Sequence, residues 1–127
     1  MSALEVWDFE ALEIKNFKSP DEVRNFSHGK VEVVNIMGGS VGRLTLEPGW
    51  RWSLDIKPLV NTEWCEAPHF QYQVSGHLHG VMADGTEFDT YAGEVVSIPP
   101  NHDGWVVGNE PVVFIDFTGA ANYAKKT

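Results

Sequence analysis

The chain has 127 residues, 43% of them hydrophobic, and a formal net charge of −9 at pH 7. This length fits one domain with one hydrophobic core, and this apolar fraction excludes a disordered chain. The acidic balance, with no run rich in Lys or Arg, argues against a surface that binds nucleic acid.

The single cysteine excludes a disulfide within the chain. The N-terminal stretch carries acidic residues where a secretory signal peptide needs an apolar core. No apolar run approaches the length of a transmembrane helix. We therefore expect a cytoplasmic protein that binds neither nucleic acid nor membrane.

The first 18 residues carry a mixed pattern that fits either a strand or a weak helix. Ser19–Glu22 is a clearer signal, with a serine cap, a proline at the first helical position and a glutamate three residues after the cap. It predicts a short helix over Pro20–Phe26 that stops at Gly29.

Short apolar stretches separated by Gly, Pro, Asn and Asp follow, and they predict strands. The predicted strands are Val31–Ile36, Val41–Leu46, Trp50–Ile56, His69–Ser75, Leu78–Met82, Glu87–Tyr91, Val95–Ile98, Trp105–Val107 and Val112–Phe117. Strands at this spacing, with no helical pattern between them, predict an all-β antiparallel sandwich or barrel.

One face of the strand predicted at 69–75 is polar. It carries His69, Gln71 and Gln73, while the other face is apolar. Polar side chains that face the inside of a barrel need water, a ligand or a metal as partners. The two glutamine amides are therefore expected to bind a polar ligand, or else to form a hydrogen-bond ladder across strands.

Two glycines at motif spacing make the chain resemble the cupin superfamily. The second cupin motif opens with Gly, five residues and Pro, which Gly93–Pro99 matches, and Gly76 stands where the first motif ends. The resemblance implies a cupin-type double-stranded β-helix, or jelly-roll barrel, over residues 30–118. An N-terminal arm with the short helix would then span 1–29, and a C-terminal tail 119–127.

The resemblance also implies a substituted set of metal ligands. Counting back from the first motif's glycine, Glu63, Cys65 and His69 stand where the family has His, His and Glu. The second motif's histidine position falls on Gly104, and a histidine stands two residues earlier, at His102. The usual set of three histidines and one glutamate is therefore not intact.

A thiolate with imidazoles suits a divalent metal, zinc first, with iron or nickel as alternatives. Each candidate has a plainer explanation as well. Cys65 can be a small buried hydrophobe, His69 a core histidine and Glu63 an exposed loop carboxylate. His102 can be a loop histidine whose pKa is raised by the neighbouring Asp103.

Two aromatic residues and two further histidines also have alternative explanations. Tyr72 and Trp105 are candidates for the wall of a ligand pocket, with the core or a dimer interface as the alternative. His77 and His79 flank Leu78, which the resemblance puts on the inner face. The two histidines are therefore expected to point outward.

The sequence thus predicts a small cupin barrel that binds a divalent metal, a small polar ligand or both. A metal-dependent enzyme, such as a cupin dioxygenase acting on a small molecule, is the alternative, and a metal-free barrel is a third. The resemblance also implies a homodimer, in which residues 1–18 form an arm that pairs with the partner's sheet edge.

Overall fold

Two antiparallel sheets make up the part of the chain that the structure, a computed structural model, describes: residues 11–126. The strands are β1 (Glu22–Phe26), β2 (Gly29–Ile36), β3 (Gly39–Leu46), β4 (His69–Ser75), β5 (His77–Met82), β6 (Glu87–Tyr91), β7 (Val95–Ile98), β8 (His102–Val107) and β9 (Val112–Asp116). The larger sheet has the order β1-β2-β3-β9-β4-β7, and the smaller one β6-β5-β8. The predicted all-β antiparallel fold is confirmed.

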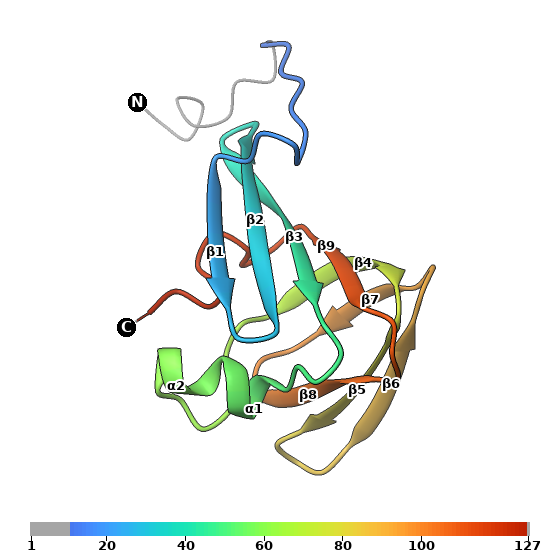
Figure 1. Ribbon diagram of the computed structural model, residues 1–127. Helices are drawn as coiled ribbons and strands as arrows, with labels where there is room; N and C mark the ends of the chain where they lie inside the picture. Colours follow the sequence, from blue (N-terminus) through green and yellow to red (C-terminus); the bar gives the residue numbers. More distant parts are fainter. Residues whose placement is uncertain (1–10, 127) are drawn as a thin grey trace.

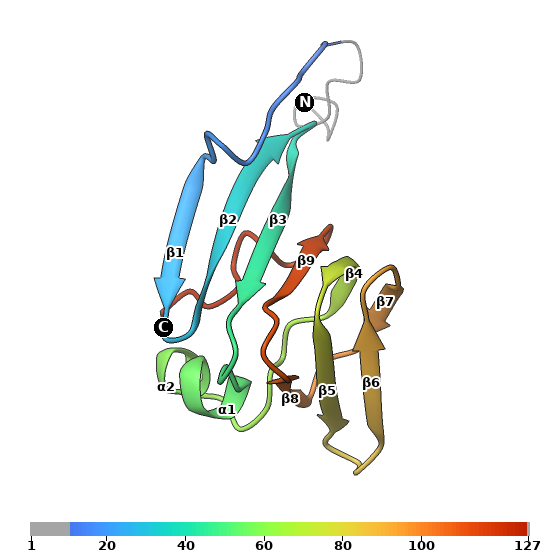
Figure 2. The same cartoon turned by 45° about the vertical axis from the view of Figure 1, so that its right-hand side comes forward.

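Two short helices, α1 (Trp52–Asp55) and α2 (Lys57–Val60), close one end of the barrel. Figure 1 shows them beside the turn that joins β1 to β2, and Figure 2 shows residues 11–21 at the opposite end of these strands. Both views show β1 and β2 extending beyond the smaller sheet. Within residues 11–126, no helix is long and apolar enough to cross a membrane.

The helix predicted over Pro20–Phe26 is wrong, because Glu22–Phe26 is strand β1. This segment pairs with β2, from Glu22 opposite Val33 to Phe26 opposite Gly29. A helix of about seven residues has little stability of its own, so the sheet hydrogen bonds outweigh the capping signal. β1 thus belongs to the larger sheet, although it precedes residue 30.

The strand predicted over Trp50–Ile56 is also wrong, because α1 and α2 occupy most of this stretch. Trp52 and Ile56 are buried on one side of the helical turns while Leu54 is 69% exposed. The Asp55 carboxylate accepts a hydrogen bond from the Arg51 N–H at 2.9 Å, which satisfies a free donor at the helix start. Trp52 and Ile56 are four residues apart, so helical turns bury both side chains on one side, and this burial favours helix over strand.

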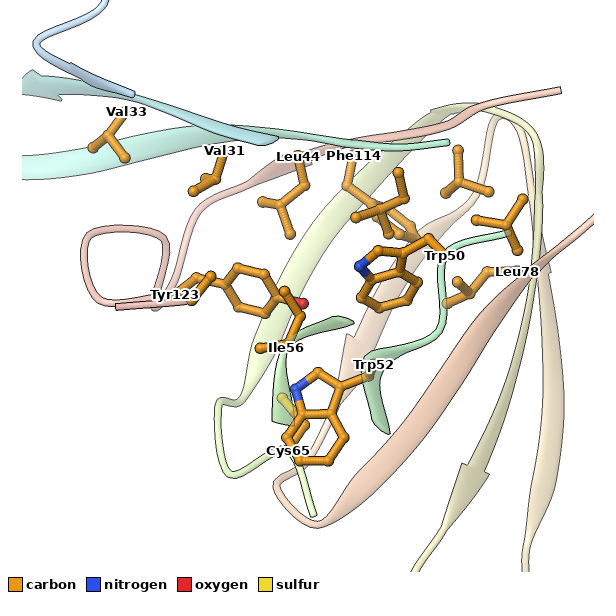
Figure 3. Packing of buried hydrophobic residues seen from close by; sticks show 14 residues of the cluster. Val31, Val33, Leu44, Trp50, Trp52, Ile56, Cys65, Leu78, Phe114 and Tyr123 are labelled. Atoms are coloured by element: carbon orange, nitrogen blue, oxygen red, sulfur yellow. The ribbon is translucent and has the colours of Figure 1, made fainter. Parts of the chain in front are cut away.

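The core fills the space between the sheets and the helices, as Figure 3 shows. Val31, Leu44 and Phe114 enter it from the larger sheet, and Leu78 enters from the smaller one. Tyr123 comes from the C-terminal segment and is 5% exposed. The core therefore recruits side chains from both sheets and from beyond the last strand.

The predicted N-terminal arm, residues 1–18, lies partly outside the described residues. Its described part contacts the larger sheet of its own chain. Glu13 accepts a hydrogen bond from the Met37 N–H at 3.0 Å, and the Arg43 guanidinium lies 4.9 Å from the centre of the Phe17 ring. Lys15 pairs with Asp21 at 3.0 Å.

Candidate metal centre

Cys65 is held beside the start of β8 by backbone hydrogen bonds. Its N–H donates to the His102 carbonyl at 2.9 Å, and its own carbonyl accepts from the Asn101 N–H at 2.7 Å. The loop at Cys65 thus pairs with β8 like one more short strand. This pairing brings Cys65, which is 4% exposed, next to a histidine 37 positions later in the chain.

His69 is the first residue of β4, and its side chain is 8% exposed. Its Nδ1 lies 2.8 Å from a carboxylate oxygen of Asp116, which is fully buried on β9. Its Nε2 faces the Cys65 sulfur at 4.0 Å. A carboxylate on one nitrogen orients the ring and increases the basicity of the other nitrogen, the arrangement typical of metal-ligating histidines.

His102 begins β8 and is 7% exposed, so it is not the loop histidine that the sequence allowed. Its Nδ1 lies 2.8 Å from the Pro99 carbonyl, which requires a proton on that nitrogen. Its Nε2 is left with a free lone pair. The His69 and His102 rings lie 5.3 Å apart, centroid to centroid.

The three side chains form one group. One ligand atom from each of Cys65, His69 and His102 lies within 4.8 Å of the other two. In a tetrahedral zinc site, Zn–S and Zn–N bonds of about 2.3 and 2.0 Å separate sulfur and nitrogen by about 3.5 Å. The Cys65–His69 pair, at 4.0 Å, would need to contract by about half an ångström to reach this separation.

Burial sets the proton affinities of two of these groups. It raises the pKa of the Cys65 thiol to about 11 because the thiolate loses hydration. Burial first, and the charge of His69 second, lower the pKa of His102 to about 4. The charge of Asp103 raises the His102 pKa, as expected, but this effect is smaller than the two that lower it, so the net shift is downward. His102 is therefore a neutral imidazole near pH 7.

The remaining residues proposed from the sequence lie apart from this group. Glu63 is exposed in the loop before Cys65 and does not belong to the cluster. Tyr72 is 42% exposed on the outer face of β4. Trp105 is half-buried on the outer side of β8, where its ring lies 4.3 Å from the Arg51 guanidinium. Neither aromatic side chain lines the interior cavity next to the cluster.

Gln71 and Gln73 both point inward, but to different surroundings. Gln71 is 3% exposed and lines the cavity beside the cluster. Gln73 is fully buried, and its amide nitrogen donates to the carbonyls of Gly76 at 2.9 Å and Thr90 at 3.2 Å. Gln73 thus forms hydrogen bonds between strands, which is the alternative to ligand binding given above, whereas Gln71 faces the cavity.

Two residues near the cluster were not identified from the sequence, Asp116 and Tyr123, whereas Trp50 had been considered for a pocket wall or the core. Asp116 orients His69, and Trp50 and Tyr123 line the same cavity. The Tyr123 ring meets the His69 ring edge to face at 5.6 Å. These contacts join positions far apart in the sequence, and no local pattern signals them.

His77 and His79 point outward, as expected, while Leu78 is buried. Both rings contact one Asp89 carboxylate oxygen, His77 at 2.7 Å and His79 at 2.9 Å, and His79 also contacts Glu87 at 2.8 Å. Hydrogen bonds to Asp89 and then Glu87 raise the pKa of His79. Asp89 and Glu87 thus supply hydrogen-bond partners for the two histidine rings at the surface.

Neither a family model nor a curated protein matches the sequence. Among solved structures, a formate complex of Lactobacillus farciminis oxalate decarboxylase is similar over 75% of this chain, at TM-score 0.54 and 24% identity. A mutant of Bacillus subtilis oxalate decarboxylase is similar over 84%, at TM-score 0.56 and 23% identity.

A protein of unknown function from Acidithiobacillus ferrooxidans is similar over 76% of this chain and 85% of its own length, at TM-score 0.54 and 18% identity. The chain spans only 30% and 28% of the two oxalate decarboxylase chains. At these identities the likeness concerns the fold. Together with the two antiparallel sheets and the glycine spacing, it shows that the chain has the cupin fold.

Proposed function

We propose that this cupin barrel binds one divalent metal ion through Cys65 Sγ, His69 Nε2 and His102 Nε2, with zinc as the favoured metal and iron or nickel as alternatives. The observation that carries the proposal is the convergence of three buried ligand atoms within 4.8 Å of one another. Thiolate and imidazole are both good zinc ligands.

The surroundings of the two histidines support this assignment. In each ring, Nδ1 is engaged by an acceptor, Asp116 in one case and the Pro99 carbonyl in the other. Both rings therefore turn Nε2 toward the cluster in the form that binds a metal. A histidine that only filled the core would not need a fully buried carboxylate behind it.

Three protein ligands leave one position of a tetrahedral ion free for a small molecule. Such an ion acts as a Lewis acid on a bound oxygen or lowers the pKa of a bound water. The chain's own residues fix two rings, supply a thiolate and exclude bulk water from the cluster. Gln71 extends the same cavity with an amide.

We propose that the protein functions as a binding or sensing module, and a metal-dependent enzyme is the second candidate. The similarity to oxalate decarboxylases lends the second candidate only limited support, because it concerns the fold. The thiolate favours the first, because an iron dioxygenase site usually uses histidine and carboxylate ligands.

Cobalt titration tests the metal site. Purified protein freed of metal with a chelator should take up one Co²⁺ and develop a thiolate-to-cobalt absorption band. Cys65→Ser should lose that band and weaken Zn²⁺ binding at least tenfold, because a hydroxyl is a poor ligand for this metal. His77→Ala, which removes an outward histidine, should bind as the unchanged protein does. Full metal content in Cys65→Ser would refute the site.

We also propose that the protein is a homodimer, built on the outer face of β4 and its neighbours. Five large apolar side chains of this outer apolar face are between 42% and 68% exposed: Phe70, Tyr72, Val74, Val95 and Phe117. Exposed apolar patches of this kind mark surfaces that other proteins cover.

A further inference from the structure

The interior cavity beside Cys65, His69 and His102 is lined by residues with polar groups that the proposed metal does not need. Its volume is about 40 Å³, and it is bordered by the three cluster residues, by Trp50 and Gln71, and by apolar side chains. The apolar part of its wall includes Leu44, Leu46, Leu78, Ile98 and Phe114. Figure 3 shows Trp50 among these core residues with its ring nitrogen turned toward the side of Tyr123.

Two residues of this wall each carry a buried polar atom without a hydrogen-bond partner among the described residues. The two atoms are Nε1 of Trp50, a donor, and Oε1 of Gln71, an acceptor. Trp50 is 4% exposed and Gln71 is 3% exposed, so bulk water does not reach them. Buried polar groups are almost always paired, and one donor and one acceptor on residues of the same cavity wall point to a bound molecule.

The cavity distinguishes this pair from other unpaired atoms. Gln73 Oε1, Thr90 Oγ1 and Arg24 Nη1 also lack a partner among the described residues, but none of these residues lines the cavity. Trp50 and Gln71 therefore share a space with the cluster residues, whereas the others do not.

The volume limits what can bind. One water needs about 10–15 Å³ measured in this way, so the cavity offers about three water-sized positions. A molecule of about three or four non-hydrogen atoms fills such a space, and a longer one meets the packed core.

The charge of the wall favours an uncharged molecule. Among the described residues, no Lys or Arg lines the cavity, whereas Asp103 does. The Cys65 thiolate and the buried Asp116 carboxylate behind His69 together offset the two charges of a bound divalent ion. An anion beside it would then be desolvated with no side-chain cation to pair with, which is costly.

We propose that the cavity selects an uncharged molecule of about three or four non-hydrogen atoms that carries a carbonyl oxygen next to an N–H or O–H group. Trp50 Nε1 donates a hydrogen bond to the oxygen, and Gln71 Oε1 accepts one from the N–H or O–H group. A short primary amide is the simplest member of this class. The proposal rests on the proposed metal site for the open position next to the ligand.

Titration of ¹⁵N-labelled, zinc-loaded protein with graded probes tests the size limit. The probes are formamide and acetamide, which fit the cavity, and butyramide, which exceeds it. Formamide and acetamide should shift the Trp50 indole N–H resonance, which the spectrum of Trp50→Phe assigns. Butyramide should shift it at least tenfold less at equal concentration. Equal effects of butyramide and acetamide, or no shift with any probe, would overturn the proposal.

A pair of isosteric probes tests the role of Gln71. Acetone has the shape of acetamide but no N–H group, so the unchanged protein should bind acetamide at least fivefold more tightly than acetone. In Gln71→Leu this preference should disappear, because the acceptor is gone. A preference that survives in Gln71→Leu contradicts the assignment. Because the readout is a ratio of affinities in one folded variant, a change in overall stability does not imitate it.

Trp105→Phe is the matched control for Trp50→Phe, since Trp105 lies outside the cavity. Ligand-observed NMR should show that Trp50→Phe weakens the binding of acetamide and of acetone alike, and that Trp105→Phe weakens the binding of neither.

Repeating the acetamide and acetone titrations on metal-free protein, with zinc content measured on the same samples, separates the two proposals. A protein that takes up no zinc and still prefers acetamide through Gln71 refutes the metal site alone, and a zinc-loaded protein without the preference refutes the present inference alone.

Discussion

At the scale of single residues, the chemistry of the cluster is governed by burial. A buried thiol with a pKa of about 11 keeps its proton near pH 7, so a metal ion must displace that proton to bind. His102, with a pKa of about 4, has no proton to lose on Nε2 at the same pH. The cost of binding the metal is thus concentrated at Cys65.

Zinc affinity should therefore depend on pH in a defined direction. Between pH 6.5 and 8 the thiol pKa lies above the solution pH, so each metal bound releases a proton from Cys65. Affinity should rise about tenfold for each pH unit in this range. Competition with a chromophoric chelator measures it, and an affinity that does not change with pH would contradict binding through the Cys65 thiolate.

The metal-free protein should lose stability in acid through His102. Its pKa is lowered from 6.5 to about 4 by folding, so the unfolded chain binds the proton more tightly. The free energy of unfolding should fall as the pH drops from about 6.5 toward 4, by up to about 3 kcal/mol. Urea unfolding of chelator-treated protein measures this loss.

His102→Gln provides the comparison for that pH dependence. Glutamine does not titrate, so the variant should lose less stability between pH 6.5 and 4 than the unchanged protein does. The opposite ranking would mean that another group dominates the acid response.

Local spacing in the sequence identified the three cluster residues but not their partners. Cys65, His69 and His102 follow from the positions of Gly76 and Gly93. Asp116 was missed because it meets His69 only through the pairing of β4 with β9. Trp50 was assigned to a strand, and the helical turn after it was not anticipated.

At the scale of elements, the C-terminal segment closes the barrel over the cluster. Arg24 on β1 donates hydrogen bonds to the carbonyls of Ala120 at 2.9 Å and Ala121 at 2.8 Å. Ala120 packs against Gly42, where an added Cβ would lie 2.4 Å from the Ala120 methyl carbon. These contacts hold Tyr123 against His69.

Arg24→Met should loosen this closure. It removes two hydrogen bonds to backbone carbonyls, which should lower the free energy of unfolding by about 1–3 kcal/mol. Cys65 of metal-free protein should then react faster with a thiol reagent, because Tyr123 no longer shields it. Lys30→Met, which removes a half-exposed lysine next to Glu32, is the control and should leave the reactivity unchanged.

Arrangement in space also explains which elements could be predicted from the sequence. Strands β4, β6 and β7 have the predicted bounds because alternation and turn glycines are local signals. The segment Glu22–Phe26 carries a helix signal and yet forms a strand, because β2 supplies its hydrogen bonds. Hydrogen bonding to a neighbouring strand thus determined the secondary structure of a segment whose own sequence favoured a helix.

At the scale of the whole molecule, the outer apolar face should support association of two copies. Light scattering should give the mass of a dimer, and Tyr72→Glu combined with Val95→Lys should give a monomer, because charges on the face oppose its burial. Leu54→Lys changes an equally exposed apolar residue on α1 and should leave the dimer intact. A monomeric unchanged protein at high concentration would rule out the dimer.

We propose above that Cys65, His69 and His102 hold one metal ion inside the barrel. A crystal structure of the zinc-loaded protein, with anomalous data at the zinc edge, tests it most directly. We expect one strong anomalous peak about 2.3 Å from Cys65 Sγ and about 2.0–2.1 Å from each histidine Nε2. A zinc peak only at the surface histidines His77 and His79, or no peak inside the barrel, would contradict it.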